Sequence, residues 1–279
     1  SMFVTKEKKK TLIETTGGER LYTGPLQSRG GLEVLPLFRE QTRTWTPEEE
    51  EVTPLNSLRL MEVPTYGSMV LRNTSAKYPL VVPMNIGFFQ HGAQNHATSR
   101  TLVLQGGESY LAKDCFCIQE AQGGLLKQSQ QRILSLPLGL RGKALSERHQ
   151  EGFSRLWNSI DEYTRKFGIA RGGHLERFLR PYFPRLLPFR HSFENLPGQE
   201  GAAFFLGGNL VGVELCPTPQ YWDEFYPILL IYTYGPEALL AQRYDVKPEN
   251  KPLQIENLPS LEELKNRLLQ KRQACREAL

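Results

Sequence analysis

GAAFFLGGNLVGVEL, residues 201–215, is the stretch that indicates the fold class most clearly. Two apolar runs, each of strand length, flank Gly207, Gly208 and Asn209. Glycine and asparagine accept the positive φ angles that a tight hairpin turn requires. We therefore predict two antiparallel strands joined at this turn.

Short apolar runs of the same kind fill the N-terminal half of the chain. They alternate with polar residues or are rich in branched residues, and glycine, proline or asparagine bounds them, as is typical of strands. The runs are LEVLPLF (32–38), SLRLMEV (57–63), SMVLRN (68–73), YPLVVP (78–83), TLVLQ (101–105) and CFCI (115–118). Glycine pairs between such runs, as in LVLQGGESYLA around Gly106 and Gly107, predict further hairpins.

Helical patterns take over after residue 143. Residues 145–168 predict one helix, because apolar residues recur at helical spacing until Gly168, which is a natural stop. We expect a second helix in residues 171–193, where Pro181 and Pro184 should end or bend it.

The last third of the chain predicts two more helical segments. Thr218 and Pro219 should start a helix, because threonine caps well and proline fits the first turn. We expect a disturbance of that helix at Pro227 and a break at Gly235-Pro236. Residues 260–279 predict an amphipathic terminal helix with early acidic and late basic residues.

This order of elements predicts the fold class and its division. Strands first and helices later indicate an α+β fold, with several antiparallel strands in the N-terminal half and helices mainly in the C-terminal half. We expect an N-terminal extension or edge strand at residues 1–30 and a single α+β domain at residues 31–245. A linker and the terminal helix would occupy residues 246–279.

Composition narrows the class of protein. The 279 residues are 39% hydrophobic and 23% charged, as in an ordinary globular protein, and the formal net charge of +4 gives no reason to expect nucleic acid as a partner. No apolar run approaches the ~20 residues that span a bilayer, so we expect no membrane partner. The four cysteines, at 115, 117, 216 and 275, form no disulfide framework, and we expect reduced thiols in a cytoplasmic protein.

FFQHGAQNHATSR, residues 88–100, places amides and imidazoles beside an apolar run. Such side chains either bind base edges, hydroxyls and phosphates or satisfy backbone groups in a buried turn. The spacing of five between the two histidines aligns poorly on a strand or a helix, and we find no motif for a metal or another cofactor. The candidate ligand contacts are His91, Gln94, Asn95 and His96.

Arginines interleave with aromatic residues in residues 171–193. Arg177 and Arg180 are three apart, so on a helix they project from one side, where they could grip phosphate groups. The alternative is a helix whose aromatic residues are core and whose arginines are solvated.

Three residues are candidates for acid/base catalysis, and Cys117 is considered separately as a possible nucleophile. Glu120, Glu214 and His96 are the acid/base candidates. Glu214 follows a predicted strand with alternating apolar residues, and it is either paired with one of the arginines of residues 171–193 or catalytic. Cys117 fits a core thiol better than a nucleophile, because free cysteines are often buried and no arginine follows at the spacing of a phosphatase loop.

The order of several motifs, each weak alone, resembles a known family. The motifs are GLEVLPLF (31–38), LRLMEVPTYGSMVLRNTSAKYPLVVP (58–83), HGAQNHATSRTLVL (91–104), CFCIQEAQGG (115–124), GAAFFLGGNLVGVEL (201–215) and YWDEFYPILLIYTYGPEAL (221–239). From about residue 31 to about residue 242 the chain is similar to the bacterial ARG and rhodanese-phosphatase-superfamily-associated protein domain family, in which ARG means ADP-ribosylglycohydrolase. The resemblance implies a link to NAD and ADP-ribose metabolism and no particular reaction.

The chain departs from the pattern of this family at three places. His96 stands where an arginine is usual, Gln119 stands where a glutamate is usual, and residues 84–87 lack a Gly-Glu pair. These departures leave open whether the chain is an enzyme.

We expect the chain to bind an ADP-ribose-like, NAD-derived or other nucleotide ligand, with or without processing it. Gln94, Asn95 and His96 would contact the ligand, and Arg177 or Arg180 would contact its phosphates. The alternative is a noncatalytic interaction module that docks onto an ADP-ribose-handling enzyme, a protein partner in NAD metabolism. A deep pocket that joins residues 90–96 to Glu120 or Glu214 favours ligand chemistry, and a shallow apolar face favours docking.

Overall fold

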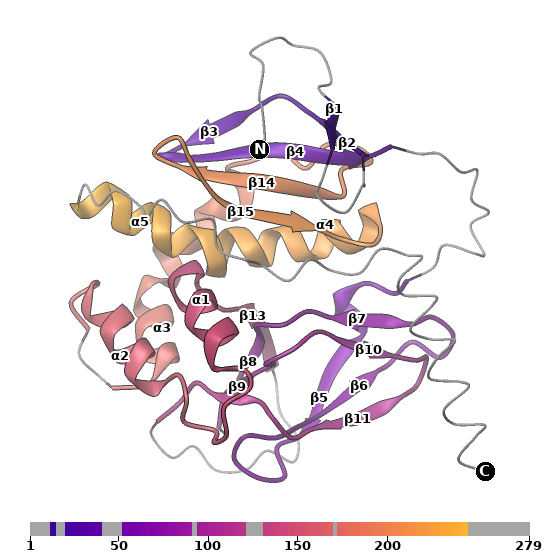
Figure 1. Cartoon of the computed structure of the whole chain (residues 1–279), viewed down its shortest axis with the longest axis vertical. Coiled ribbons are helices and arrows are strands. Elements are labelled where there is room, and N and C mark those ends of the chain that lie inside the picture. The colour runs from indigo at the N-terminus through magenta and orange to yellow at the C-terminus, as the bar shows by residue number, and fades with distance from the viewer. Residues whose placement is uncertain are drawn as a thin grey trace.

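The computed structural model describes residues 12–14, 20–40, 52–90, 94–120, 131–169 and 172–244. The fold is α+β, as predicted, with antiparallel strands mostly in the N-terminal half and helices mainly in the C-terminal half. A six-stranded sheet forms one end of the molecule, and a long helical segment crosses beneath it (Figure 1). Shorter helices and three smaller sheets form the other end.

The six-stranded sheet is built around the hairpin that the sequence predicted. Gly207 and Gly208 have φ angles of 56° and 80°, which confirms the turn between its two strands. The first of these strands also pairs along its full length with a strand from the start of the chain. The strands are β1 (Leu12–Glu14), β2 (Arg20–Thr23), β3 (Gln27–Arg29), β4 (Leu32–Arg39), β14 (Gly201–Leu206) and β15 (Asn209–Leu215), in the order β1-β2-β4-β14-β15 with β3 also on β4.

The smaller sheets show that one predicted hairpin was wrong. The turn at Gly106-Gly107 forms, with Gly107 at φ 73°, but the strands on either side of it do not pair with each other. One pairs with β7 and the other with β6, because pairing partners are chosen by long-range packing as well as by the turn. The strands are β5 (Leu58–Glu62), β6 (Met69–Asn73), β7 (Leu80–Val82), β8 (Ile86–Gln90), β9 (His96–Ala97), β10 (Leu102–Leu104), β11 (Ser109–Ala112), β12 (Phe116–Cys117) and β13 (Gln131–Ser135).

The single helix predicted for residues 145–168 is instead two. Helix α1 (Leu138–Glu147) begins earlier than expected, and α2 (Trp157–Arg165) follows after a turn. Gly152 takes a left-handed φ of 98°, which ends helical geometry there. Arg155 holds the turn by donating hydrogen bonds to the carbonyl oxygens of Glu147, Arg148 and Gln150.

The prediction was that Pro181 and Pro184 end or bend this helix, and they do not end it: helix α3 (Leu175–Leu186) continues through both. A proline in a helix interior costs about 3 kcal/mol, which the packing of the helix must offset. Both prolines face solvent, while Phe178 and other apolar residues of α3 are buried. A 3-10 turn, η2 (Leu187–His191), extends the helix, and η1 (Leu55–Ser57) is a similar short turn before β5.

The helix that starts at Thr218 runs much further than predicted. The Thr218 hydroxyl accepts a hydrogen bond from the backbone N–H of Tyr221 at 3.1 Å, which confirms the predicted cap. The helix changes to π geometry soon after Pro227, which confirms the disturbance expected there. Gly235-Pro236 does not break it, because Gly235 has a helical φ of −55°. The elements are α4 (Pro219–Ile228), the π-helix η3 (Leu229–Tyr234) and α5 (Gly235–Tyr244).

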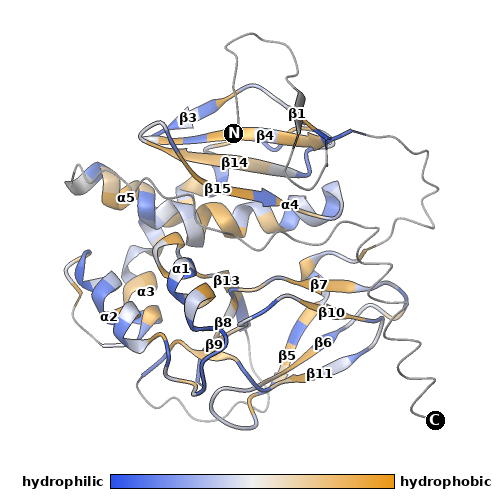
Figure 2. Cartoon of the chain, viewed as in Figure 1, coloured by the Kyte–Doolittle hydropathy of each residue, from blue (hydrophilic) through white to orange (hydrophobic). Residues whose placement is uncertain are grey.

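One main hydrophobic core joins the sheets and helices, and apolar residues are concentrated in strands such as β4, β14 and β7 (Figure 2). A second, small cluster lies on β2, β4, β14 and β15 and contains Leu35 and Leu37 of β4. None of the described helices is long and apolar enough to cross a membrane. His91 and the helix predicted at 260–279 lie outside the described residues.

Candidate functional site

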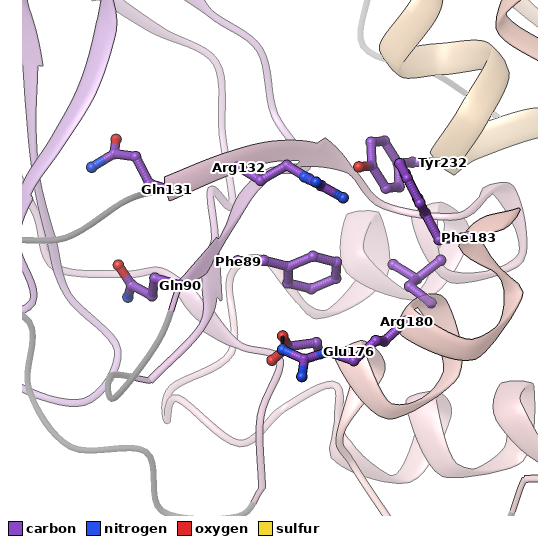
Figure 3. A pocket seen from close by; sticks show the side chains of 9 residues that line it. Phe89, Gln90, Gln131, Arg132, Glu176, Arg180, Phe183 and Tyr232 are labelled. Carbon is purple, nitrogen blue, oxygen red and sulfur yellow. Dashed lines mark hydrogen bonds and ion pairs between the residues drawn. The ribbon is translucent and has the colours of Figure 1, made fainter. Parts of the chain in front are cut away.

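A pocket of about 370 Å³ opens where β8, β13, α3 and the π-helix meet (Figure 3). Cationic, amide, acidic and aromatic side chains share its wall. In the close-up view, the ring of Phe89 lies between Arg132 on one side and Glu176 with Arg180 on the other. The lining residues are Phe89, Gln90, Gln131, Arg132, Glu176, Leu179, Arg180, Phe183 and Tyr232.

Strand pairing fixes one wall of the pocket. β8 and β13 are antiparallel neighbours, and their register places Gln90 opposite Gln131 and Phe89 opposite Arg132. The Gln131 side chain is held in place because its amide exchanges two hydrogen bonds with the backbone of Leu60, at 2.7 and 2.8 Å. This wall is therefore set by backbone geometry.

Arg132 lies over an aromatic surface at one end of the pocket. Its guanidinium carbon is 4.6 Å from the ring centroid of Phe183, and Phe183 stacks on Tyr232 at 6.3 Å between centroids. Burial raises the pKa of Tyr232 despite the opposing effect of Arg132, so this phenol is neutral at pH 7. No carboxylate of the described residues forms an ion pair with Arg132.

Glu176 is the carboxylate at the other end. One of its oxygens accepts a hydrogen bond from Asn95 Nδ2 at 3.1 Å, and the other accepts one from Arg180 at 2.6 Å. The Nε2 atom of His174 lies 4.0 Å from the same carboxylate. Glu176 thus brings together two candidates, Asn95 and Arg180, that the sequence placed in separate segments.

Gln90 contributes a buried carbonyl oxygen with no partner. Its backbone N–H donates to Asn95 Oδ1 at 3.2 Å and its Nε2 donates to the Gln94 carbonyl at 2.9 Å. Its Oε1 atom is buried and accepts no hydrogen bond within the described part of the protein. Neighbouring residues of a strand point to opposite faces of the sheet, and the Gln90 side chain points away from the ring of Phe89 (Figure 3), so this oxygen does not face the charged and aromatic side chains of the lining.

Gln94 and His96 lie beneath the pocket and do not line it. Gln94 Nε2 donates to the Gln119 carbonyl and to Cys117 Sγ. His96 Nε2 accepts from the Gly67 N–H at 2.8 Å, and its Nδ1 lies 3.2 Å from the Gln94 carbonyl. Burial lowers the pKa of His96 to about 4, so the ring is neutral at pH 7 and both of its nitrogens are hydrogen-bonded.

The remaining candidates also lie apart from the pocket lining. Glu120 is exposed and accepts a hydrogen bond from the Gly173 N–H at 2.5 Å. Arg177 is exposed on α3 and is not a lining residue, although it lies three residues from Arg180. The pocket therefore includes Gln90 from the polar stretch but joins it to neither Glu120 nor Glu214.

Glu214 is paired, and its partner was not foreseen. It is buried and accepts hydrogen bonds from Arg141 at 2.5 Å and from the Tyr234 hydroxyl at 2.9 Å. The expectation that an arginine of residues 171–193 would pair with it was wrong, because α1 brings Arg141 against β15 instead. Arg141 also donates to Ser135 at 2.9 Å, which ties α1 to β13.

Cys117 is fully buried, as the sequence predicted. Burial raises the pKa of its thiol, which makes the thiolate scarce at pH 7. Within the described residues no group of three or more His, Cys, Asp or Glu residues could hold a metal ion.

Sequence reasoning missed several residues that line the pocket, among them Glu176, Arg132 and Tyr232. Glu176 and Arg180 are four apart on a helix, which is the spacing of an ion pair and was a readable signal. Arg132 and Tyr232 carried no such signal, because each reaches the pocket only through contacts between distant parts of the chain.

Comparison with known proteins places the chain in a family. Searches of curated proteins and of solved structures found no match. The family model described as the ARG and Rhodanese-Phosphatase-superfamily-associated Protein domain matches residues 20–278. Since that match spans nearly the whole chain, the protein belongs to the ARG and Rhodanese-Phosphatase-superfamily-associated Protein domain family.

Proposed function

We propose that the pocket between β8, β13 and α3 binds an ADP-ribose-like or other nucleotide ligand. The observation that carries the proposal is the combination of two arginines and an aromatic surface around one cavity. Its volume of about 370 Å³ lies in the range of small-molecule sites.

The arginines supply the phosphate contacts. Arg132 has no carboxylate partner among the described residues, so its charge is available to an anion. Arg180 already donates to Glu176 but has further N–H groups at the rim of the pocket. Guanidinium groups bind phosphate oxygens with two parallel hydrogen bonds, which favours a phosphorylated ligand.

The aromatic residues supply a surface for a base. Phe89, Phe183 and Tyr232 line the pocket together, and the last two are already stacked on each other. Stacking of a base on an aromatic side chain contributes about 1–3 kcal/mol. An adenine ring is of the right kind for this surface, and the family description connects the domain with ADP-ribosylglycohydrolases.

The geometry favours a protein that binds the ligand and does not catalyse a reaction on it. The acid/base candidates Glu120, Glu214 and His96 all lie outside the pocket lining. Among the described residues, Glu176 is the acidic residue in that lining, and it is already held in place because each of its oxygens accepts one hydrogen bond, from Asn95 and from Arg180. We infer that the protein presents or senses the ligand for a partner enzyme of ADP-ribose metabolism, which also accounts for the association in the family description.

A thermal-shift screen tests this proposal. A ligand that binds only the native state stabilises it by about 2.7 kcal/mol at one hundred times its Kd. We expect ADP-ribose to raise the Tm, and unphosphorylated adenosine to raise it much less. If neither ADP-ribose, NAD nor AMP shifts the Tm at millimolar concentration, the proposal is wrong.

A further inference from the structure

The hydrogen-bonding groups of the pocket are divided between its two ends. Arg132 on β13 offers only donors, because a guanidinium has five N–H groups and no acceptor. Glu176 on α3 offers acceptors, and the Asn95 side chain donates a hydrogen bond to one of its oxygens. The pocket therefore has a donor end and an acceptor end.

The donor end is the place for an anion. Arg132 lies on the face of Phe183, which holds its planar group in one orientation. The described residues bring no carboxylate to it, whereas Arg180 at the other end is paired with Glu176 at 2.6 Å. The uncompensated positive charge of the pocket is therefore concentrated at Arg132.

The acceptor end requires a ligand that donates hydrogen bonds. A carboxylate such as Glu176 has about four lone-pair sites, of which two are used here. Because Arg180 already balances the charge of Glu176, this end is electrically close to neutral. A neutral donor such as a hydroxyl group fits it better than an ammonium group, which would meet Arg180.

We propose that the pocket selects a phosphorylated sugar with free vicinal hydroxyls and binds it in one orientation. The phosphate lies at Arg132, and the two vicinal hydroxyls donate to the two carboxylate oxygens of Glu176. This inference rests on the proposed function and adds to it the sugar specificity, with Glu176 as the residue that determines it.

Two pairs of probes separate the two ends of the pocket. AMP and 2′-deoxy-AMP, like ribose 5-phosphate and 2-deoxyribose 5-phosphate, differ by one hydroxyl of the diol. A hydrogen bond to a charged group contributes about 1.5–3 kcal/mol, so we expect the ribose form to bind about 10- to 100-fold more tightly. Calorimetric titration of each probe gives this ratio for the unmodified protein.

Two substitutions should separate the overall affinity from the ribose-to-deoxyribose affinity ratio. Glu176→Gln removes the charged acceptor and should reduce the ribose-to-deoxyribose ratio to near one. Arg132→Gln should weaken both forms of a pair by a similar factor and leave their ratio unchanged. Arg190→Gln, on the exposed end of η2 outside the pocket, is the matched control and should change neither quantity.

The outcomes distinguish this inference from the proposed function. If ADP-ribose binds and the unmodified protein binds ribose and deoxyribose forms alike, the sugar specificity is wrong while the proposed function stands. The sugar specificity is also wrong if Arg132→Gln abolishes the ratio and a folded Glu176→Gln, or Glu176→Asp where Gln impairs folding, preserves it. If no phosphorylated probe binds, both fail.

Discussion

His96 and Asn95 are neighbours in the chain with different surroundings. Asn95 bridges the backbone of Gln90 and the carboxylate of Glu176, so it supports the pocket from behind. His96 joins the Gly67 N–H to the Gln94 carbonyl and is buried. The sequence grouped both as ligand contacts because amides and imidazoles have the same hydrogen-bonding capacity in either role.

The buried His96 should make the protein sensitive to acid. Its pKa of about 4 lies below the ordinary value of 6.5, so the unfolded chain binds a proton that the folded chain does not. The stabilisation is present above pH 6.5 and is lost as the pH falls from about 6.5 to about 4. The full effect is on the order of 3 kcal/mol.

Thermal unfolding followed between about pH 7.5 and about pH 4 checks this prediction. His96→Gln removes the titrating group and should flatten the pH dependence of the Tm in that window. Burial also lowers the pKa of His174, so His174→Gln is the matched comparison and a part of the slope should remain in each single variant. An unchanged slope in His96→Gln would contradict the assignment.

At the scale of the element, helix α3 gives two arginines with the same sequence pattern different positions relative to the pocket. Arg177 and Arg180 have the same sequence signal, but only Arg180 lines the pocket. Its exposed charge contributes modestly, so Arg180→Ala should weaken ADP-ribose binding about 3- to 10-fold and reduce its salt dependence. Arg177→Ala should leave both unchanged in the same titration, and equal losses in the two variants would show that α3 acts only through its overall charge.

The π-helix is the second element on which the pocket depends. Tyr232 reaches the pocket from it, while the nearby Tyr234 is held by the buried Arg141–Glu214 pair. Removing one partner of a buried ion pair leaves an uncompensated charge, which costs about 3–5 kcal/mol.

We therefore expect Arg141→Met to lower the free energy of unfolding by about that amount in denaturant titrations. Tyr234→Phe removes only one hydrogen bond to Glu214 and should cost about 1 kcal/mol. If Arg141→Met is as mild as Tyr234→Phe, the pair does not stabilise this region.

A helix start or a turn could be predicted from the sequence where the residues that cause it are neighbours in the chain. The hairpin at Gly207-Gly208 and the cap at Thr218 follow from turn and capping chemistry within a few residues. The helix through Gly235 could not be predicted in this way. The Gly235 N–H donates a hydrogen bond to the Leu230 carbonyl oxygen, so the backbone hydrogen bonding of the π-helix continues through the glycine despite its low helix propensity.

At the scale of the whole molecule, the pocket is assembled from strands and helices that are far apart in the chain. β8 and β13 supply one wall, while α3 and the π-helix supply the other. The sequence indicated the α+β fold and the family, but the partnership of Asn95 with Glu176 spans 81 residues. No periodicity or motif encodes such a contact, and for this reason Arg132 and Tyr232 are identified as site residues only from the fold.

The central claim is that this pocket binds a nucleotide ligand through Arg132. Isothermal titration calorimetry of ADP-ribose into the unmodified protein and into Arg132→Gln, each at two salt concentrations, tests it most directly. We predict saturable binding to one site in the unmodified protein and affinity reduced about 10-fold or more, with a weaker salt dependence, in Arg132→Gln. Absence of binding to the unmodified protein, or equal affinity and equal salt dependence in the two proteins, would contradict the claim.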